Sequence, residues 1–475
     1  MFVLLPSTND YAVYPSILPC KKETTLTIIP RAWSFFFFEG EEYTVKITSV
    51  FGDEEDYHYP QNFCLLTVKA TGGVLTFSYT PAMEGEHLIR VFRDDKPLCE
   101  LVTYALEEDL YGLRPLKGDL HTHSYRSDGR CDPAFLATHH REQGYDFLAL
   151  TDHNRYYPGD EIDVAFAGVN TGLLRIVGEE VHATGCPIHI VNNGGRSSII
   201  PLFGHAPENY EREVADIQAT LPDTIPEQFC SRYARAKWVV DHIHATGGIA
   251  TFAHPFWRPG ASRTLNVVDE FAELLLMSGM FDAFEIVGGI NSIAINRQVN
   301  FWADLRAKGL HIPVVGSSDV HRIGPDGPTF PNSFTVAFAA DNTQDAVLDA
   351  VKNGLTVAVE ATGNGYDRHY RPYGSTRLIS YAQYLLCHYF PHRQRIIEGE
   401  GEMMRRYLTG ECPKELIEQI AAQGEDYTLR FLGKKPPVLP STEALAVEER
   451  LRDVQRNGPQ HRTGDFTSDA VNYQI

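Results

Sequence analysis

A repeated alternation of apolar and polar segments constrains the fold of this chain more than any other feature of its sequence. Between residues 116 and 316, short apolar runs, polar tips and amphipathic stretches of helical periodicity follow one another repeatedly. Such alternation is typical of parallel α/β folds, in which each helix crosses back to the next strand. We therefore expect an α/β protein with a parallel barrel in this region. The apolar runs that fit its strands are 116–120, 147–151, 173–177, 188–192, 249–253, 281–287 and 312–316.

Local signals support this alternation. Asp132 and Pro133 provide an N-cap and a first-turn proline for a helix that Gly144 ends. Residues 193–230 are rich in Gly, Pro and Ser and form a long insertion between two predicted strands. This insertion is a candidate lid.

The residues in front of the barrel follow a different pattern. From about 25 to 106, short β segments alternate with turn sequences such as Glu39-Gly40 and Asp94-Asp95. This spacing predicts a small antiparallel sandwich of Ig-like type, with Phe35 to Phe38 filling its core. The predicted strands are 25–29, 34–38, 43–48, 64–69, 74–79, 87–92 and 98–104.

Beyond about residue 360 the strand pattern stops. Helical periodicity predicts helices over 378–389, 394–408, 414–423 and 441–456, followed by a polar, mobile end from Pro459. The expected domains are therefore a β-sandwich over 1–110, the barrel over 111–360, and a helical extension with a mobile tail over 361–475.

Composition excludes several classes of function. The formal net charge of −20 disfavours non-specific nucleic-acid binding, because much of the surface would repel a polyanion. The eight cysteines include no CxxC pair, so neither a disulfide framework nor a thiolate zinc site is expected. No apolar run approaches the roughly 18 residues of a membrane span, and Met1 to Cys20 lacks a secretory-signal pattern. We expect a cytoplasmic protein.

Histidines and carboxylates occur where the predicted strands end. In a parallel barrel these strand ends converge on one face, where active sites are assembled. The positions are His121 and His123 after the first strand, Asp152 and His153 after the second, Glu179 and Glu180 after the third, His189 inside the fourth, His254 at the end of the fifth, and Asp319 and His321 after the seventh.

Two of these groups have period-two spacing. In an extended segment the two histidines of His121-Thr122-His123 point the same way, and Asp319 and His321 do the same. Each pair can therefore offer two ligands to one cation. An isolated HxH is ordinary, but two such pairs with further His and Glu positions at successive strand ends predict a polynuclear metal cluster.

The motifs that carry these residues resemble a known family. GDLHTHSYRSDG, LALTDHN, GEEV, IHIVN, AHPF and GSSDVH resemble, in this order, the motifs of the polymerase-and-histidinol-phosphatase (PHP) superfamily. The resemblance covers about residues 114 to 360. The β domain in front, the TDHN and the later GPTFPNSFTVAF are most similar to the CehA/McbA branch. The resemblance implies a distorted (β/α)7 barrel preceded by the β-sandwich and followed by the helical extension.

The resemblance also implies a trinuclear site and its ligands. One metal would be held by His121, His123, Glu180 and Asp319, a second by Asp128, His153 and His321, and a third by His189 and His254 with Glu180 as a bridge. Of these, Asp128, His153, Glu180 and His321 are the expected catalytic residues. Asp128 stands where some members of the family have histidine. Glu180 is preferred to Glu179 because of its GxE spacing from Gly178.

The donor types limit the metal, and neighbouring residues have open roles. Imidazole and carboxylate without thiolate suit two or three ions of Mn, Fe or Zn. Asp119 and Asp152 are either acceptors that orient the histidines or turn residues. Arg155, Arg258 and Arg322 could bind a substrate anion or form salt bridges at the rim, and Glu285 could line the pocket. We expect His139, His140, His242 and His244 on solvated helix faces.

Such a cluster predicts hydrolysis. Bound cations lower the pKa of a water to give hydroxide near neutral pH and neutralise charge in the transition state. The first interpretation is a phosphoesterase acting on a small, anionic phosphate ester. The alternatives are hydrolysis of a carboxylic or carbamate ester, as the CehA/McbA resemblance suggests, and a non-catalytic metal-binding module. A role of the β domain in partner binding, and a homo-oligomer, stay open.

Overall fold

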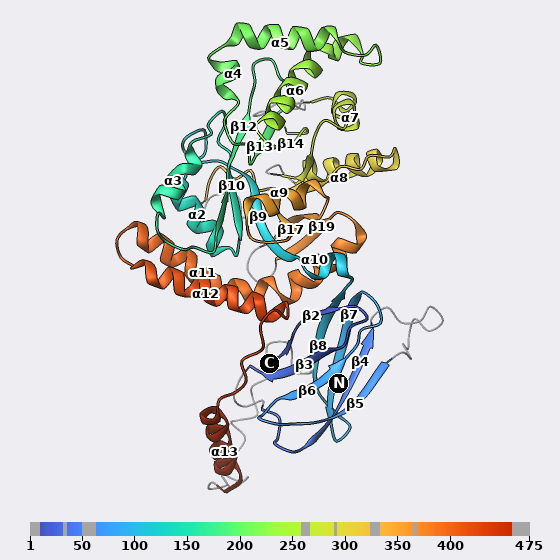
Figure 1. The fold of residues 1–475 in the computed structure, drawn as a ribbon, viewed down its shortest axis with the longest axis vertical. Coiled ribbons are helices and arrows are strands. Elements are labelled where there is room, and N and C mark those ends of the chain that lie inside the picture. Colours follow the sequence, from blue (N-terminus) through green and yellow to red (C-terminus); the bar gives the residue numbers. More distant parts are fainter. Residues whose placement is uncertain are drawn as a thin grey trace, which may run out of the picture. The chain divides into compact units, whose positions relative to one another are not determined.

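The structure is a computed structural model that describes residues 10–31, 36–49, 63–257, 267–288, 292–323, 333–363 and 368–457. The chain divides into two compact units, residues 1–111 with 429–475 and residues 112–428 (Figure 1). The residues from 361 onward are thus shared between the units. Within the described ranges, no helix combines the length and the apolar character that crossing a bilayer requires.

The first unit contains two β-sheets. One sheet has the strand order β1-β3-β6, and the other has the order β2-β8-β7-β4-β5. Leu26 of β3 and Phe77 of β6 share one apolar core with Val45 of β4 and Ile89 of β7. The elements are β1 (Tyr11–Tyr14), β2 (Ile17–Pro19), β3 (Thr24–Pro30), β4 (Glu42–Ser49), β5 (Phe63–Lys69), β6 (Leu75–Tyr79), β7 (Gly85–Arg93), β8 (Lys96–Leu106), α1 (Glu108–Tyr111) and α13 (Thr442–Asn457).

The sheet pairing differs from the sequence prediction in one respect. Most neighbouring strands are antiparallel, as expected, but β2 pairs with β8 in parallel. Strands β1 and β2, which precede the predicted β segments, were not predicted. Of the predicted strand 34–38, residues 34 and 35 lie outside the described residues, and Phe36 to Phe38 form no strand.

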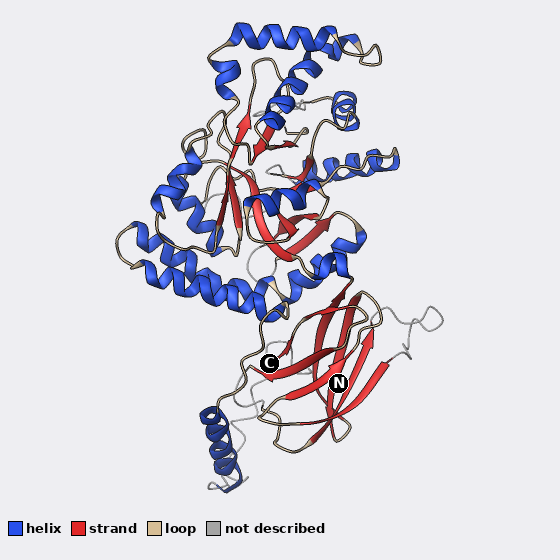
Figure 2. Ribbon diagram, in the orientation of Figure 1, coloured by secondary structure: helices blue, strands red, loops and turns tan. Residues whose placement is uncertain are grey.

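The second unit is a mixed α/β structure. Figure 2 shows its strands in the interior with helices around them. The strands are β9 (Arg114–Thr122), β10 (Phe147–Leu150), β11 (Leu174–Ile176), β12 (Gly178–Val181), β13 (Ile190–Asn193), β14 (Ile249–Phe252), β15 (Ala283–Val287), β16 (Val314–Gly316), β17 (Ser333–Ala339), β18 (Thr356–Thr362) and β19 (His369–Tyr373). The helices are α2 (Pro133–Glu142), α3 (Pro158–Ala165), α4 (Ile200–Gly204), α5 (Pro207–Ala219), α6 (Glu227–Ala245), α7 (Asp269–Met277), α8 (Ser292–Ala307), α9 (Gln344–Lys352), α10 (Thr376–His388), α11 (Phe390–Leu408) and α12 (Lys414–Phe431).

The strands of this unit form two sheets with mixed pairing. The strand orders are β11-β10-β9-β17-β18-β19 and β12-β13-β14-β15-β16. The pairs of β9, β10 and β11 and of β14, β15 and β16 are parallel, as predicted. However, β13 is antiparallel to both β12 and β14, and β17 is antiparallel to both of its neighbours. The prediction of a parallel barrel was therefore correct for the α/β class and for these parallel pairs, and wrong for the antiparallel ones. The link between β12 and β13 contains no helix, and parallel strands require a longer crossover.

The chain changes sheet at Val177. Strand β11 ends at Ile176 in one sheet, and β12 begins at Gly178 in the other. Both glutamates of GEEV were expected after a strand, whereas they lie within β12. Strands β17, β18 and β19 were not predicted, and β19 lies beyond residue 360, where the strand pattern was expected to stop.

Predicted helices are found in most of the expected places. Asp132 caps α2, and its side chain accepts hydrogen bonds from the backbone of Ala134 and Phe135. The insertion expected as a lid contains α4 and α5. The four helices expected after residue 360 correspond to α10, α11, α12 and α13.

The two sheets of the second unit are joined near the ends of their strands. His153, after β10, forms a parallel bridge with Glu180 of β12, and Val320, after β16, forms one with Thr122 of β9. Backbone hydrogen bonds run from Glu180 to Thr151 and from Asp319 to His121. These contacts bring the ends of different strands and the segments after them to one end of the unit, where the predicted ligands lie.

Candidate metal centre

Glu180 lies at the centre of a buried cluster of imidazoles. Its side chain is fully buried, and each carboxylate oxygen faces a different set of histidines. Around Oε2 lie His153 Nδ1 at 2.7 Å, His121 Nε2 at 3.2 Å and His123 Nε2 at 3.3 Å. Around Oε1 lie His189 Nδ1 at 2.9 Å, His254 Nε2 at 3.4 Å and His182 Nε2 at 3.6 Å.

Glu179 points to the other face of β12, because side-chain direction alternates along a strand. Its Oε1 accepts hydrogen bonds from Asn192 Nδ2 and Ile199 N, each at 3.0 Å, and its Oε2 accepts one from Ser198 Oγ at 2.6 Å. Glu179 is therefore satisfied within the protein and anchors the segment that follows β13. Of the two glutamates, the cluster contains Glu180, the one that the GxE spacing favoured.

The HxH pair contacts Asp319. The Nε2 atoms of His121 and His123 are 3.1 Å apart, and Asp319 Oδ1 lies 3.4 Å and 3.0 Å from them. Both rings therefore face the same side of the extended segment, as the spacing predicts. Asp319 Oδ2 also lies 3.8 Å from His254 Nε2. The ligand atoms of His121, Glu180 and His254 form another group within 4.8 Å of one another.

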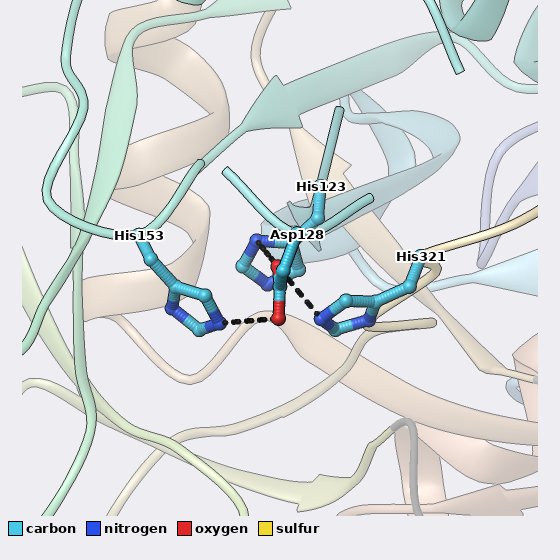
Figure 3. Close-up of side chains that lie close together, drawn as sticks. All are labelled: His123, Asp128, His153 and His321. Atoms are coloured by element: carbon cyan, nitrogen blue, oxygen red, sulfur yellow. Dashed lines mark ion pairs between the residues drawn. The ribbon is translucent and has the colours of Figure 1, made fainter. Parts of the chain in front are cut away.

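A second group surrounds Asp128 (Figure 3). Its carboxylate lies 3.4 Å from His153 Nε2, 3.2 Å from His321 Nε2 and 3.9 Å from His123 Nδ1. The family resemblance assigned Asp128, His153 and His321 to one metal, and His123 lies beside them. Side-chain exposure is 55% for Asp128, 37% for His321 and 23% for His153, against none for Glu180. Solvent therefore reaches the cluster at this group.

Buried polar atoms in the cluster lack hydrogen-bond partners among the described residues. Such atoms are normally satisfied, because a lost hydrogen bond costs about 1–3 kcal/mol. A divalent cation would satisfy them, and nitrogen and oxygen donors without thiolate suit Mn, Fe or Zn. The residues present thus fit bound metal. The unpartnered atoms are both oxygens of Glu180, Asp319 Oδ1, and the Nδ1 atoms of His153, His189 and His254, together with His182 Nε2.

Backbone strain also occurs in the cluster. His254 and Asp319 have positive φ values of 22° and 49°, which side-chain-bearing residues adopt at a cost of order 1–3 kcal/mol. Gly129 is required nearby, because a Cβ there would lie 2.5 Å from the carbonyl oxygen of His123. The surrounding structure therefore holds these side chains in place against local preference.

The carboxylates favour positive charge in the cluster. Burial by itself lowers the pKa of His121, but the charges of Glu180 and Asp319 raise it well above its usual range. Burial likewise opposes protonation of His123, yet the nearby carboxylates of Asp319 and Glu180 raise its pKa to about 9. Burial dominates at His189 and lowers its pKa to about 4. A divalent cation would supply the positive charge that protons supply otherwise.

Asp119 and Asp152 hold the backbone of the ligand segments. Asp119 accepts hydrogen bonds from the backbone N–H of His121 and of Ser318. Asp152 accepts hydrogen bonds from the backbone and hydroxyl groups of Ser124 and Ser127. Only the contact of Asp119 with His121 is local, and the others join segments 25 to 199 positions apart. Neither the turn interpretation nor the role of an acceptor for a ligand ring therefore describes these contacts fully.

His182 and His140 were missed or misjudged from sequence, and Glu285, named as a residue that could line the pocket, makes a contact that the sequence did not specify. His182 lies two positions after Glu180, and the same period-two rule could have found it. Glu285 Oε2 lies 2.9 Å from His121 Nδ1, a contact between residues 164 positions apart that no local pattern indicates. His140 is fully buried, 3.5 Å from Asp119, which contradicts the predicted solvated face.

The three arginines that were considered as contacts to a substrate anion differ in their surroundings. Arg155 is exposed, and its Nη1 donates a hydrogen bond to the carbonyl of Asn154. Arg322 is half-buried beside His321. Arg258 lies outside the described residues. The sequence prediction that they bind substrate therefore stays a prediction.

Comparisons with known proteins give partial similarities. No family model matches the sequence. The chain is 40% identical over 57 residues to the DNA polymerase/3'-5' exonuclease PolX of Bacillus subtilis (strain 168), a match that covers 12% of this chain and 10% of that protein. The chain thus spans about a tenth of the length of this curated relative.

Solved structures with similarity to this chain include two hydrolases. One is a two-domain protein containing a predicted PHP-like metal-dependent phosphoesterase from Bacteroides vulgatus, at 19% identity and a TM-score of 0.36, covering 52% of this chain and 66% of that one. Another is an amidohydrolase from Chromobacterium violaceum with bound sulfate and no metal, at 20% identity and a TM-score of 0.30, covering 44% of this chain and 89% of that one. At TM-scores below 0.5 these likenesses assign no substrate to this chain.

Proposed function

We propose that this chain is a metal-dependent hydrolase of PHP type whose preferred substrate is a small phosphate ester. The observation that carries the proposal is the arrangement around Glu180, where both carboxylate oxygens face imidazoles and neither has a hydrogen-bond donor among the described residues. A buried carboxylate in this state suits a bridging ligand between two cations. The proposed ligands are His121, His123, Asp128, His153, Glu180, His189, His254, Asp319 and His321.

When bound, two or three divalent cations would activate a water molecule and offset the negative charge of the phosphate oxygens. The protein's own residues orient the donors. Glu285 faces His121 Nδ1, which leaves Nε2 directed at Glu180. The Asp319 carboxylate lies between the rings of His121 and His123 and keeps both nitrogens on one side.

The substrate would approach at the Asp128 group, since Asp128 and His321 are its most exposed members. Arg155 and Arg322 follow His153 and His321 closely in sequence, and we propose them as contacts to the phosphate oxygens. Several cations together with arginine favour a dianionic group over a neutral ester. We therefore rank phosphate esters before the carboxylic and carbamate esters of the CehA/McbA alternative.

Elemental analysis followed by a substrate panel tests this function. Purified protein should contain two or three equivalents of Mn, Fe or Zn. It should cleave p-nitrophenyl phosphate or bis-p-nitrophenyl phosphate in preference to p-nitrophenyl acetate and a p-nitrophenyl carbamate, which share one leaving group. Turnover of the carbonyl substrates alone would replace the phosphate proposal with the CehA/McbA alternative. Less than one metal equivalent after reconstitution would exclude the cluster, and a loaded but inactive protein would favour the non-catalytic module.

A further inference from the structure

His182 lies on the same side of the chain as Glu180. It directly follows β12, two positions after Glu180, so extended backbone directs both side chains the same way. Its Nε2 lies 3.6 Å from Glu180 Oε1. Its ring centroid is 3.6 Å from that of His189 and 4.2 Å from that of His153. His182 therefore belongs spatially to the cluster, although the family resemblance gives it no role.

The backbone of His182 is held by Asn154. The side-chain oxygen of Asn154 accepts a hydrogen bond of 2.9 Å from His182 N, and its Nδ2 donates one of 3.4 Å to His182 O. The backbone N–H of Asn154 also donates to the carbonyl of Glu180 at 2.9 Å. Asn154 has a φ of 49°, a conformation that asparagine tolerates better than most residues. These hydrogen bonds fix the backbone of His182 and therefore the position from which its imidazole extends.

The ring nitrogen that faces Glu180 is otherwise unused. Nε2 of His182 is buried and has no hydrogen-bond partner among the described residues, and its 3.6 Å separation from Glu180 is too long for a hydrogen bond. A histidine that only fills space normally finds a partner for such an atom. The ligand atoms of His153, Glu180 and His182 lie within 4.8 Å of one another, close enough to bind one ion together.

We propose that His182 is a further metal ligand, which binds a first-row divalent cation through Nε2 on the Oε1 side of Glu180. This inference rests on the proposed function, because it requires that cations bind at Glu180. It adds an imidazole to the side of the carboxylate that His189 and His254 already face. Nitrogen-rich sites of this kind suit Zn, Fe or Mn better than Mg or Ca.

Metal binding by His182→Ala tests the proposal independently of catalysis. The matched control is His205→Ala, since His205 is an exposed histidine at the end of α4, with no cluster contact among the described residues. Apoprotein is reconstituted with Co²⁺ or Zn²⁺, and the metal content, the affinity in competition with a chelator and the visible absorption of the cobalt form are measured. His182→Ala should lose one equivalent, or bind it at least 10-fold more weakly, with a changed cobalt spectrum. His205→Ala should match the wild type.

Different results identify different errors. A His182→Ala protein with wild-type stoichiometry, affinity and cobalt spectrum would overturn the role of His182 and leave the proposed hydrolase standing. A wild-type protein that binds less than one equivalent would overturn both. If circular dichroism shows that apo His182→Ala is unfolded, His182→Gln, which keeps a polar side chain at the position, decides the matter by the same measurements. Wild-type metal binding by His182→Gln would then count against the proposal.

Discussion

Two buried charged groups in the second unit contrast in how their charges are satisfied. Arg141 of α2 and Glu400 of α11 are nearly inaccessible to solvent and pair with each other, with Arg141 Nε donating to Glu400 Oε2 at 2.8 Å. Glu400 Oε1 accepts a hydrogen bond from Gly172 N, and Arg141 Nη1 donates to the carbonyl of Tyr145. The polar atoms of this pair thus find partners within the protein. The pair needs no ligand, and its role is to join two helices.

Glu180 is as deeply buried as Glu400, but its carboxylate oxygens lack the hydrogen bonds that those of Glu400 accept. Histidines surround it, yet neither of its oxygens accepts a hydrogen bond from a described residue. A buried carboxylate without hydrogen bonds is costly, and the fold tolerates it here together with two positive φ values. From this contrast we propose that a buried charge with complete internal partners serves stability, whereas one that lacks hydrogen bonds binds a ligand. The following changes test this distinction.

The largest effect is expected for Glu180→Gln. The change keeps the shape but removes the charge that offsets repulsion between neighbouring cations. Metal should be lost from both sides of the residue, and turnover should fall by at least about 100-fold, since even outer contacts of metal ligands cost 10–100-fold. His189→Ala should loosen mainly one equivalent, because it removes one neutral donor. Elemental analysis and steady-state kinetics compare the two variants. Full metal loading of Glu180→Gln would show that Glu180 is not the bridge.

Arg141→Met should act on stability instead. Removing one partner of a buried pair leaves Glu400 uncompensated, at a cost of about 3–5 kcal/mol in the free energy of unfolding. The metal content per folded chain should stay at the wild-type value. Urea unfolding followed by circular dichroism measures the first quantity and elemental analysis the second. Selective loss of metal in a stably folded variant would mean that the two buried groups are coupled.

Glu179→Gln is the closest control for Glu180→Gln, since the two residues are neighbours on β12. Asn192 and Ile199 donate to the same oxygen of Glu179, which the glutamine carbonyl can replace. The hydroxyl of Ser198 can rotate to accept from the new amide. We expect a loss of about 1 kcal/mol in unfolding free energy and normal metal content. A metal-poor Glu179→Gln beside a loaded Glu180→Gln would move the bridging role by one residue.

The smallest effect is expected at an exposed pair. Lys237 and Asp241 are separated by one turn of α6, and Lys237 Nζ lies 2.9 Å from Asp241 Oδ1. Their side chains are 41% and 45% exposed. Lys237→Ala should change the unfolding free energy by no more than about 0.5 kcal/mol, because solvent screens such pairs. Metal content should be unaffected. An effect comparable to that of Arg141→Met would mean that burial does not separate structural from surface charges in this chain.

Sequence reasoning succeeded where local backbone geometry decides the outcome. The predicted strands of the barrel region appear as β9, β10, β11, β13, β14, β15 and β16. His121 and His123 occur together at the end of β9 because period-two spacing needs only extended backbone. Asp319, by contrast, has a positive φ of 49°, so the extended backbone assumed for Asp319 and His321 does not hold there. The sequence did not predict β12 or β17 to β19 as strands. Their pairing depends on contacts with strands that are distant in the sequence, and not only on their own residues.

By itself, the sequence determined the kinds of donor in the candidate site and the order in which they occur, since both are properties of short segments. The GxE spacing favoured Glu180 over Glu179, but only the tertiary structure gives the physical reason, because the side of β12 that meets the cluster depends on its pairing with β13 and its bridge to His153. The same holds for Glu285, which reaches His121 across 164 positions, and for the unmet hydrogen bonds of Glu180. Contacts between distant segments are set by packing the whole unit, and no local pattern of residues contains them.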